Sequence, residues 1–244
     1  MSEGKTWPVG DGGASFLDAS ALIVAAHELK SPLALIRQLS LELEQASSKE
    51  IRPQLVEQIR LSAERALRLT NDLTKSARAQ AQLFEQEPIS PQRIIGDVAR
   101  ELHPLYAAHQ RMLVTETKRG VPLVSANYDL LRRILCNFAD NALRYGDDRG
   151  RVTLYNKQQK QTQLVRFGVR DYGPLVPQTA WRKLEHVFSS TPYVSSSRPE
   201  SSGLGLTICR QFAEAMGATI GLVQHRDGMS FYVDVPMSKQ LSLL

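Results

Sequence analysis

A heptad-like apolar pattern in the first third of the chain constrains the fold more than any other feature. Within residues 17–47 and again within 52–84, apolar or small side chains recur at alternating steps of four and three residues. This spacing is typical of helices that bury one face in a bundle. The positions are Leu22, Ala26, Leu29, Leu33, Ile36, Ser40 and Leu43, then Leu55, Ile59, Ser62, Ala66, Leu69 and Leu73. Because two helices cannot bury both stripes alone, the pattern predicts a helical hairpin that pairs with a second copy in a dimeric four-helix bundle.

The remainder of the chain alternates between helix-like and strand-like patterns. A polar segment with two prolines, 85–91 (EQEPISP), is typical of a linker, so we divide the chain into a flexible N-terminal segment 1–16, a hairpin 17–86 and a second domain 87–244. The helices expected in the second domain span 92–108, 127–145 and 203–216, and the strands span 111–117, 122–125, 151–158, 162–170, 218–224 and 229–236. Mixed elements of this kind predict an α/β two-layer sandwich.

Composition and charge narrow the class of protein. Hydrophobic residues make up 42% of the 244 residues and charged residues 23%, which excludes a disordered chain. Two cysteines are too few for a disulfide framework, and no stretch is apolar enough to cross a membrane, so we expect a cytoplasmic protein or the cytoplasmic part of a longer membrane-associated one. Residues 1–86 carry 10 basic and 11 acidic side chains, and 87–244 carry 20 and 14. The basic second part fits either nucleic acid or a small polyanion, and composition does not choose between them.

The first candidate site is His27-Glu28 in the segment HELKSPL, 27–33. His27 follows a seam position, so its imidazole is expected at the rim of the bundle, where it can act as a nucleophile. Glu28 is the adjacent acid that could orient it and take its proton. Pro32 removes a backbone donor one turn later and is expected to bend the helix. The alternative is an ordinary surface histidine.

The second candidate site lies in NFADNALRY, 137–145. Asn137, Asn141 and Arg144 share one helical face, opposite a buried stripe of Ile134, Phe138 and Ala142. Carboxamide oxygens suit Mg²⁺, and a guanidinium suits phosphate. The alternative is a solvated polar face.

Two glycine-containing turns complete the set of candidate sites. Asp171 leaves a strand before Gly173 in DYGPLVP (171–177), where a carboxylate can accept the amine of adenine. Gly203 and Gly205 open a helix in SSGLGL (201–206), where free backbone N–H groups can bind phosphate. Between them lies the serine-rich segment 189–202, which is either a functional lid or a connector.

In their order and spacing, these segments together resemble the boxes of the two-component sensor histidine kinases. HELKSPL is similar to the H-box, NFADNALRY to the N-box, DYGPLVP to the G1 box and SSGLGLTICRQFAEAMGATI to the G2 box with its helix. Val187-Phe188 is similar to the F-box, and 228–236 to the closing strand motif. The resemblance covers about 17–237. It implies a dimerising phosphoacceptor hairpin of HisKA type and an ATP-binding domain of the GHKL type.

The resemblance also implies roles for individual residues. His27 would be the phosphoacceptor, Glu28 its base, and Ser31 would stand where the family often has a threonine that positions a hydrolytic water. Asn141 would hold Mg²⁺ with support from Asn137. The remaining ATP-binding positions would be Arg144, Tyr145, Asp171, Gly173, Gly203, Leu204, Gly205 and Leu206. The implied cofactors are ATP and Mg²⁺. The implied partners are a second copy of the chain and the receiver domain of a response regulator, with no nucleic acid.

Two departures from the family pattern leave alternatives open. Leu175 stands where the G1 box usually has a second glycine, and Ser201 where the G2 box usually begins with one. We expect weaker ATP binding rather than its loss. The rival function is a nucleotide-impaired scaffold or a phosphatase-only regulator. The sequence does not identify the input signal, which could come from a separate sensory protein, nor the regulator or the choice between cis and trans phosphorylation.

Overall fold

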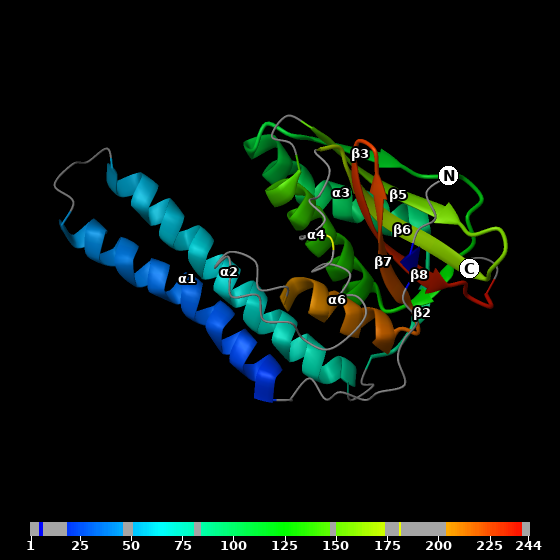
Figure 1. The fold of residues 1–244 in the computed structure, drawn as a ribbon, viewed down its shortest axis with the longest axis horizontal. Coiled ribbons are helices and arrows are strands. Elements are labelled where there is room, and N and C mark those ends of the chain that lie inside the picture. The colour runs from blue at the N-terminus through cyan, green and yellow to red at the C-terminus, as the bar shows by residue number, and fades with distance from the viewer. Residues whose placement is uncertain are drawn as a thin grey trace. The chain divides into compact units, whose positions relative to one another are not determined.

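The computed structural model describes residues 5–6, 19–45, 51–80, 84–146, 150–173, 181 and 204–240. Side chains of residues 5–6, 19–25, 27–28, 76–80, 144–145 and 204 lie outside this description. The chain divides into two compact units, a helical hairpin and an α/β unit, which Figure 1 shows as a ribbon. No helix among the described residues is both long enough and apolar enough to cross a bilayer.

The first unit contains α1 (Ala19–Gln45) and α2 (Ile51–Gln80), which pack against each other. Leu39, Leu55 and Ala66 are buried between them. However, Leu33 of the predicted stripe remains 56% exposed. Further exposed apolar side chains on the two helices are Leu35, Leu41, Ile51, Val56, Leu61 and Leu67. The hairpin of one chain therefore buries only part of its apolar surface.

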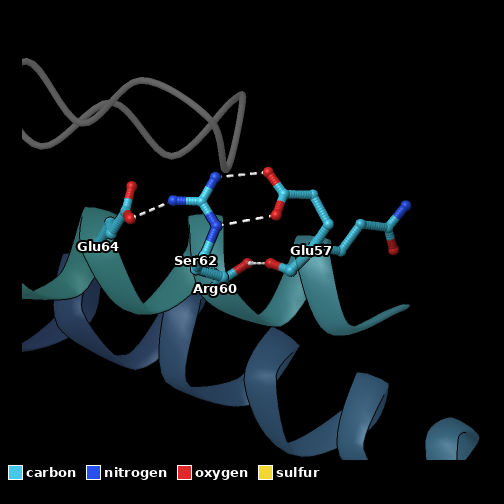
Figure 2. A network of polar contacts seen from close by, with 5 residues as sticks. Glu57, Arg60, Ser62 and Glu64 are labelled. Atoms are coloured by element: carbon cyan, nitrogen blue, oxygen red, sulfur yellow. Dashed lines mark hydrogen bonds and ion pairs between the residues drawn. The ribbon is translucent and has the colours of Figure 1, made fainter. Parts of the chain in front are cut away.

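Polar side chains on α2 form hydrogen bonds and ion pairs with groups of the same helix. Arg60 lies between Glu57 and Glu64, one helical turn away on either side, and its Nε donates to Glu57 Oε2 at 2.8 Å (Figure 2). The buried Ser62 donates its hydroxyl to the Gln58 carbonyl at 2.8 Å. Because Arg60 and Glu57 are 54% and 53% exposed, their ion pair contributes little to stability.

Among the residues that the structure describes, the α/β unit has three named helices and two sheets. Its helices are α3 (Pro91–Ala108), α4 (Tyr128–Tyr145) and α6 (Leu204–Ala215). Its strands are β1 (Lys5–Thr6), β2 (Glu87–Ile89), β3 (Met112–Glu116), β4 (Val124–Ala126), β5 (Arg151–Gln158), β6 (Leu164–Asp171), β7 (Thr219–His225) and β8 (Gly228–Pro236). All predicted elements beyond residue 91 are present, with bounds shifted by two residues or fewer.

The main sheet has the order β1-β7-β8-β6-β5-β3, in which β3 pairs parallel with β5 and the other pairs are antiparallel. The three helices lie against one side of it (Figure 1). Phe138 of α4 stacks on Phe231 of β8 with ring centroids 5.6 Å apart. Helix and sheet therefore form the two layers of the predicted sandwich around an apolar core.

Two short strands fall where the sequence predicts none. In the predicted linker, Glu87–Ile89 pairs antiparallel with β4, and Ile89 is buried. In the predicted flexible segment, Lys5–Thr6 pairs with Leu222 and Gly221 of β7. The interpretation of 87–89 as part of a linker is therefore wrong. These residues form a strand of the second unit, in which the side chain of Ile89 is buried.

A buried ion pair joins β6 to β8. Arg166 donates to both oxygens of Asp234 at 2.8 and 2.7 Å and lies 3.5 Å from the centroid of the Tyr232 ring. We expect Asp234→Ala to lower the free energy of unfolding by about 3 kcal/mol, because it leaves a largely buried guanidinium without a counter-charge. Urea denaturation measures the loss. The control is Glu57→Ala at the exposed pair, which should cost less than about 1 kcal/mol. Equal losses of unfolding free energy in the two variants would contradict the conclusion that the buried pair contributes more to stability than the exposed one.

Candidate functional site

The H-box residues lie on α1. His27 and Glu28 belong to the helix by their backbone, and their side chains lie outside the described residues. Ser31, one turn further, is exposed. The helix continues through Pro32, which is buried. Ser31 therefore presents its hydroxyl to solvent on the helix that carries His27.

The polar face of α4 is formed as the spacing predicts. Asn127 caps the helix by accepting from the Leu130 N–H at 3.1 Å. Ile134, Phe138 and Ala142 are buried on the opposite face, and Asn137 and Asn141 are half-buried. Asn141 Nδ2 donates to Asn137 Oδ1 at 3.2 Å. The backbone of Arg144 and Tyr145 is in the last turn of α4, and their side chains lie outside the described residues.

Asp171 ends β6 as a buried carboxylate, 6% exposed. Its Oδ1 accepts from the Met229 N–H at 3.0 Å. Burial raises the pKa of this carboxyl above its ordinary value, while the Met229 hydrogen bond and nearby arginines oppose the rise. The Gly173 N–H donates to the Asp227 carbonyl at 3.2 Å and so fixes the turn after the strand to the β7–β8 turn.

The first turn of α6 packs directly against Asn137. A Cβ placed on Gly205 would lie 2.6 Å from Asn137 Nδ2 and 3.2 Å from its Oδ1. Leu204 begins the helix, and Leu206 is buried. Gly203, Leu175, Ser201 and the serine-rich segment 189–202 lie outside the described residues. The N-box and G2-box residues that the structure describes are therefore neighbours.

This contact predicts a strong effect of a single methyl group. Gly205→Ala must displace the Asn137 amide, so we expect ATP affinity to fall about tenfold, which corresponds to about 1.4 kcal/mol. The control is Gly96→Ala in α3, where an added Cβ meets nothing within 4 Å and should leave binding unchanged. Isothermal titration calorimetry compares the two. Unchanged affinity in Gly205→Ala would show that this contact has no part in nucleotide binding.

The donor set on α4 suits a hard cation. The Asn137–Asn141 hydrogen bond uses the Asn141 amide nitrogen, which leaves Asn141 Oδ1 as an acceptor. A carboxamide oxygen is a suitable Mg²⁺ ligand when phosphate oxygens and water supply the remaining positions. Asn141 therefore fits the predicted metal position, with Asn137 holding its orientation.

Two residues that the sequence did not single out fix the C-terminal half of α4. The Tyr106 hydroxyl, buried at 1% exposure, donates to the Ala139 carbonyl at 2.8 Å. Arg111 donates to the Ala142 and Leu143 carbonyls at 3.0 and 2.8 Å. Tyr106 follows the apolar pattern of α3 and is typical of a core residue, and nothing in the local sequence distinguishes Arg111 from a surface arginine. Their function depends on contacts more than thirty residues away in sequence.

Comparison with known proteins identifies related sequences and folds. Residues 126–239 match the family described as histidine kinase-, DNA gyrase B-, and HSP90-like ATPase. The adaptive-response sensory kinase SasA of Rippkaea orientalis is 29% identical over 230 residues, covering 89% of this chain and 58% of that protein. SasA of Crocosphaera subtropica is 30% identical over 201 residues, 78% of this chain and 51% of that protein. The chain spans little more than half the length of these relatives.

Solved histidine kinases share the fold. Full-length ShkA in complex with AMPPNP has a TM-score of 0.60 at 25% identity, covering 91% of this chain and 47% of that one. Histidine kinase ThkA in complex with the response regulator TrrA has a TM-score of 0.64 at 19% identity, covering 92% and 63%. Both matches extend over more of the chain than the ATPase family match does.

Proposed function

Since this chain is a relative of the two-component sensor histidine kinases and residues 126–239 belong to the ATPase family named above, we propose that it is an ATP-dependent protein histidine kinase. It phosphorylates itself on His27 and passes the phosphoryl group to an aspartate of a response regulator. The proposal rests on one observation: residues of the N-box, the G1 box and the G2 box lie next to one another around α4. Asn137 contacts Gly205, and Gly146, just past the helix, lies beside Asp171.

The environments of Asp171, Asn141 and Gly205 support a role for each of them. Asp171 accepts the adenine amine through the carboxylate oxygen that does not bind Met229 N–H. Asn141 offers its amide oxygen to Mg²⁺, oriented by Asn137. Gly205 lets backbone N–H groups at the start of α6 approach phosphate. The resemblance to the family adds six further ATP-binding positions to the proposal, namely Gly173, Arg144, Tyr145, Gly203, Leu204 and Leu206.

The chemical step makes one bond and breaks one. An imidazole nitrogen of His27 attacks the γ-phosphorus in line, forming an N–P bond as the P–O bond to ADP breaks. Glu28 takes the imidazole proton. ATP would supply the phosphoryl group, and Mg²⁺ held by Asn141 would neutralise part of its charge, so the protein mainly contributes position. The exposed Ser31 hydroxyl orients a water when the phosphoryl group is removed.

The setting of the enzyme follows from its surfaces. The exposed leucines of α1 and α2 support a homodimer through the hairpin, because a second copy would cover them. A receiver domain supplies the accepting aspartate, as the complex of ThkA with its response regulator suggests by similarity. We place the chain in the cytoplasm, where ATP and response regulators are available.

The test is incubation of the full chain with Mg²⁺ and γ-labelled ATP. A phosphohistidine gives label that is lost in acid and kept in base, and we expect such label on the protein. A thermal shift with Mg²⁺ and ATP is measured in parallel. A chain that neither takes label nor gains thermal stability from ATP would overturn the proposal.

A further inference from the structure

Arg111 is a buried cation beside the candidate nucleotide site. It lies between α3 and β3 and is 7% exposed. Its Nη1 donates to the carbonyls of Ala142 and Leu143 in the last turn of α4, where a positive charge is favourable. Its Nε and Nη2 are buried without a hydrogen-bond partner in the part of the chain that the structure describes. Such a group requires an explanation beyond helix capping.

The free side of this guanidinium faces the region of Asp171. A Cβ built on Gly146 would lie 2.7 Å from Arg111 Nη2 and 3.5 Å from Asp171 Cβ. These two atoms are therefore no more than about 6 Å apart. Any side chain at 146 would fill the space between them, and glycine leaves it open. Burial raises the pKa of the Asp171 carboxyl most strongly, and the Arg111 charge is one of the influences that oppose this rise by favouring the ionised form.

The other charged or titratable groups near Asp171 have partners of their own. Arg170, the preceding residue of β6, pairs with Asp227 at 2.7 Å and lies 4.7 Å from the Tyr172 ring centroid. On α3, the Tyr106 hydroxyl donates to the Ala139 carbonyl, and burial, more than the charges of Asp140 and Asp171, raises the pKa of this tyrosine. From β8, Asp171 receives a backbone N–H and no charge. Among the described groups, Arg111 is thus the cation near Asp171 that has no carboxylate of its own.

We propose that Arg111 is a positioning residue that keeps Asp171 ionised and thereby sets the preference for a purine that carries an exocyclic amine. The proposal rests on the proposed ATP-binding function. An ionised carboxylate can only accept hydrogen bonds, which suits the amine of adenine, whereas a protonated carboxyl would present a donor to it. Because burial raises the pKa of Asp171, a nearby positive charge is needed to keep the acceptor form available.

The experiment measures how strongly the full chain prefers ATP to purine riboside 5′-triphosphate, which lacks the amine, between pH 5 and 8. The variants are Arg111→Gln and Arg111→Met, which lose the charge, and Arg111→Lys, which keeps it. Glutamine retains donors for the α4 carbonyls, so it separates the charge from helix capping. Thermal unfolding verifies that each variant is folded. If one of the two uncharged variants does not fold, the other still tests the inference.

We expect the preference for ATP to disappear on the acid side in the parent chain. Its midpoint should move to higher pH by roughly one pH unit in the uncharged variants and remain within a few tenths of a unit in Arg111→Lys. A purely structural role would weaken both nucleotides equally and leave the midpoint in place, which would overturn the inference alone. A parent chain that binds neither nucleotide would overturn the proposed function and this inference together.

Discussion

A His27→Gln chain is expected to bind ATP with the affinity of the parent and to acquire no phosphoryl label. The reason is that the proposed reaction needs the imidazole only as nucleophile, whereas Asn141, Asp171 and Gly205 belong to the other compact unit. Glutamine has no nitrogen that can attack phosphorus, so the loss should be complete within detection. Autoradiography with γ-labelled ATP measures label, and calorimetry measures binding.

The matched control for that variant is His103→Gln. His103 is an exposed histidine on α3, so its replacement should leave the label at the parental level. Label that persists in His27→Gln and disappears in His103→Gln would place the phosphoacceptor elsewhere. Label lost together with ATP binding in His27→Gln would show that the change acts on the fold instead of the chemistry.

Asp171→Asn is expected to have opposite effects on stability and binding. Burial raises the folded-state pKa of Asp171 above its unfolded value. The proton-binding contribution to stability is therefore full below the unfolded pKa and is lost as the pH rises through the folded pKa. At pH 7 the ionised group is buried at a cost, and a neutral amide should raise Tm by a few degrees.

The binding loss follows from which atom faces the ligand. The single oxygen of asparagine would stay with the Met229 N–H, so its NH₂ group would replace the free carboxylate oxygen and face the adenine amine with a donor. An unpaired buried polar group costs about 2 kcal/mol, so ATP affinity should fall about thirtyfold.

Thermal unfolding at several pH values and calorimetry test both effects of Asp171→Asn. The stability gain should shrink as the pH falls toward the raised pKa of Asp171, because the parental carboxyl then becomes neutral as well. The control is Asp227→Asn, at a side chain that is 63% exposed, which should change neither quantity appreciably. A less stable Asp171→Asn chain at pH 7 would contradict the assignment of burial as the dominant cause.

The local sequence pattern was sufficient to predict most helices and strands of the α/β unit. The helix over 128–145 was predictable because Ile134, Phe138 and Ala142 repeat at helical spacing, and this same spacing put Asn137 and Asn141 on the opposite face. The strands of the main hairpin alternate apolar and polar side chains and were predictable for the same reason.

Features that depend on distant contacts could not be predicted in this way. The pairing of Glu87–Ile89 with β4 gains its stability from a strand almost forty residues later, and the local prolines indicated a linker. Arg111 can be buried because its guanidinium donates to a carbonyl in the last turn of α4 and because residue 146 has no side chain to occupy the same space. No periodicity in the sequence carries that information. In the hairpin, the stripe was predicted, but which of its leucines one chain leaves exposed depends on how α1 meets α2.

The proposed autophosphorylation is tested most directly by locating the phosphoryl group on the full chain after reaction with Mg²⁺ and ATP. Tandem mass spectrometry at neutral pH, with ³¹P NMR of the intact protein, identifies the modified residue and the type of bond. We expect one N–P bond, on an imidazole nitrogen of His27. A phosphate ester on serine or threonine, or ATP turnover that releases free phosphate from a chain never modified at His27, would contradict it.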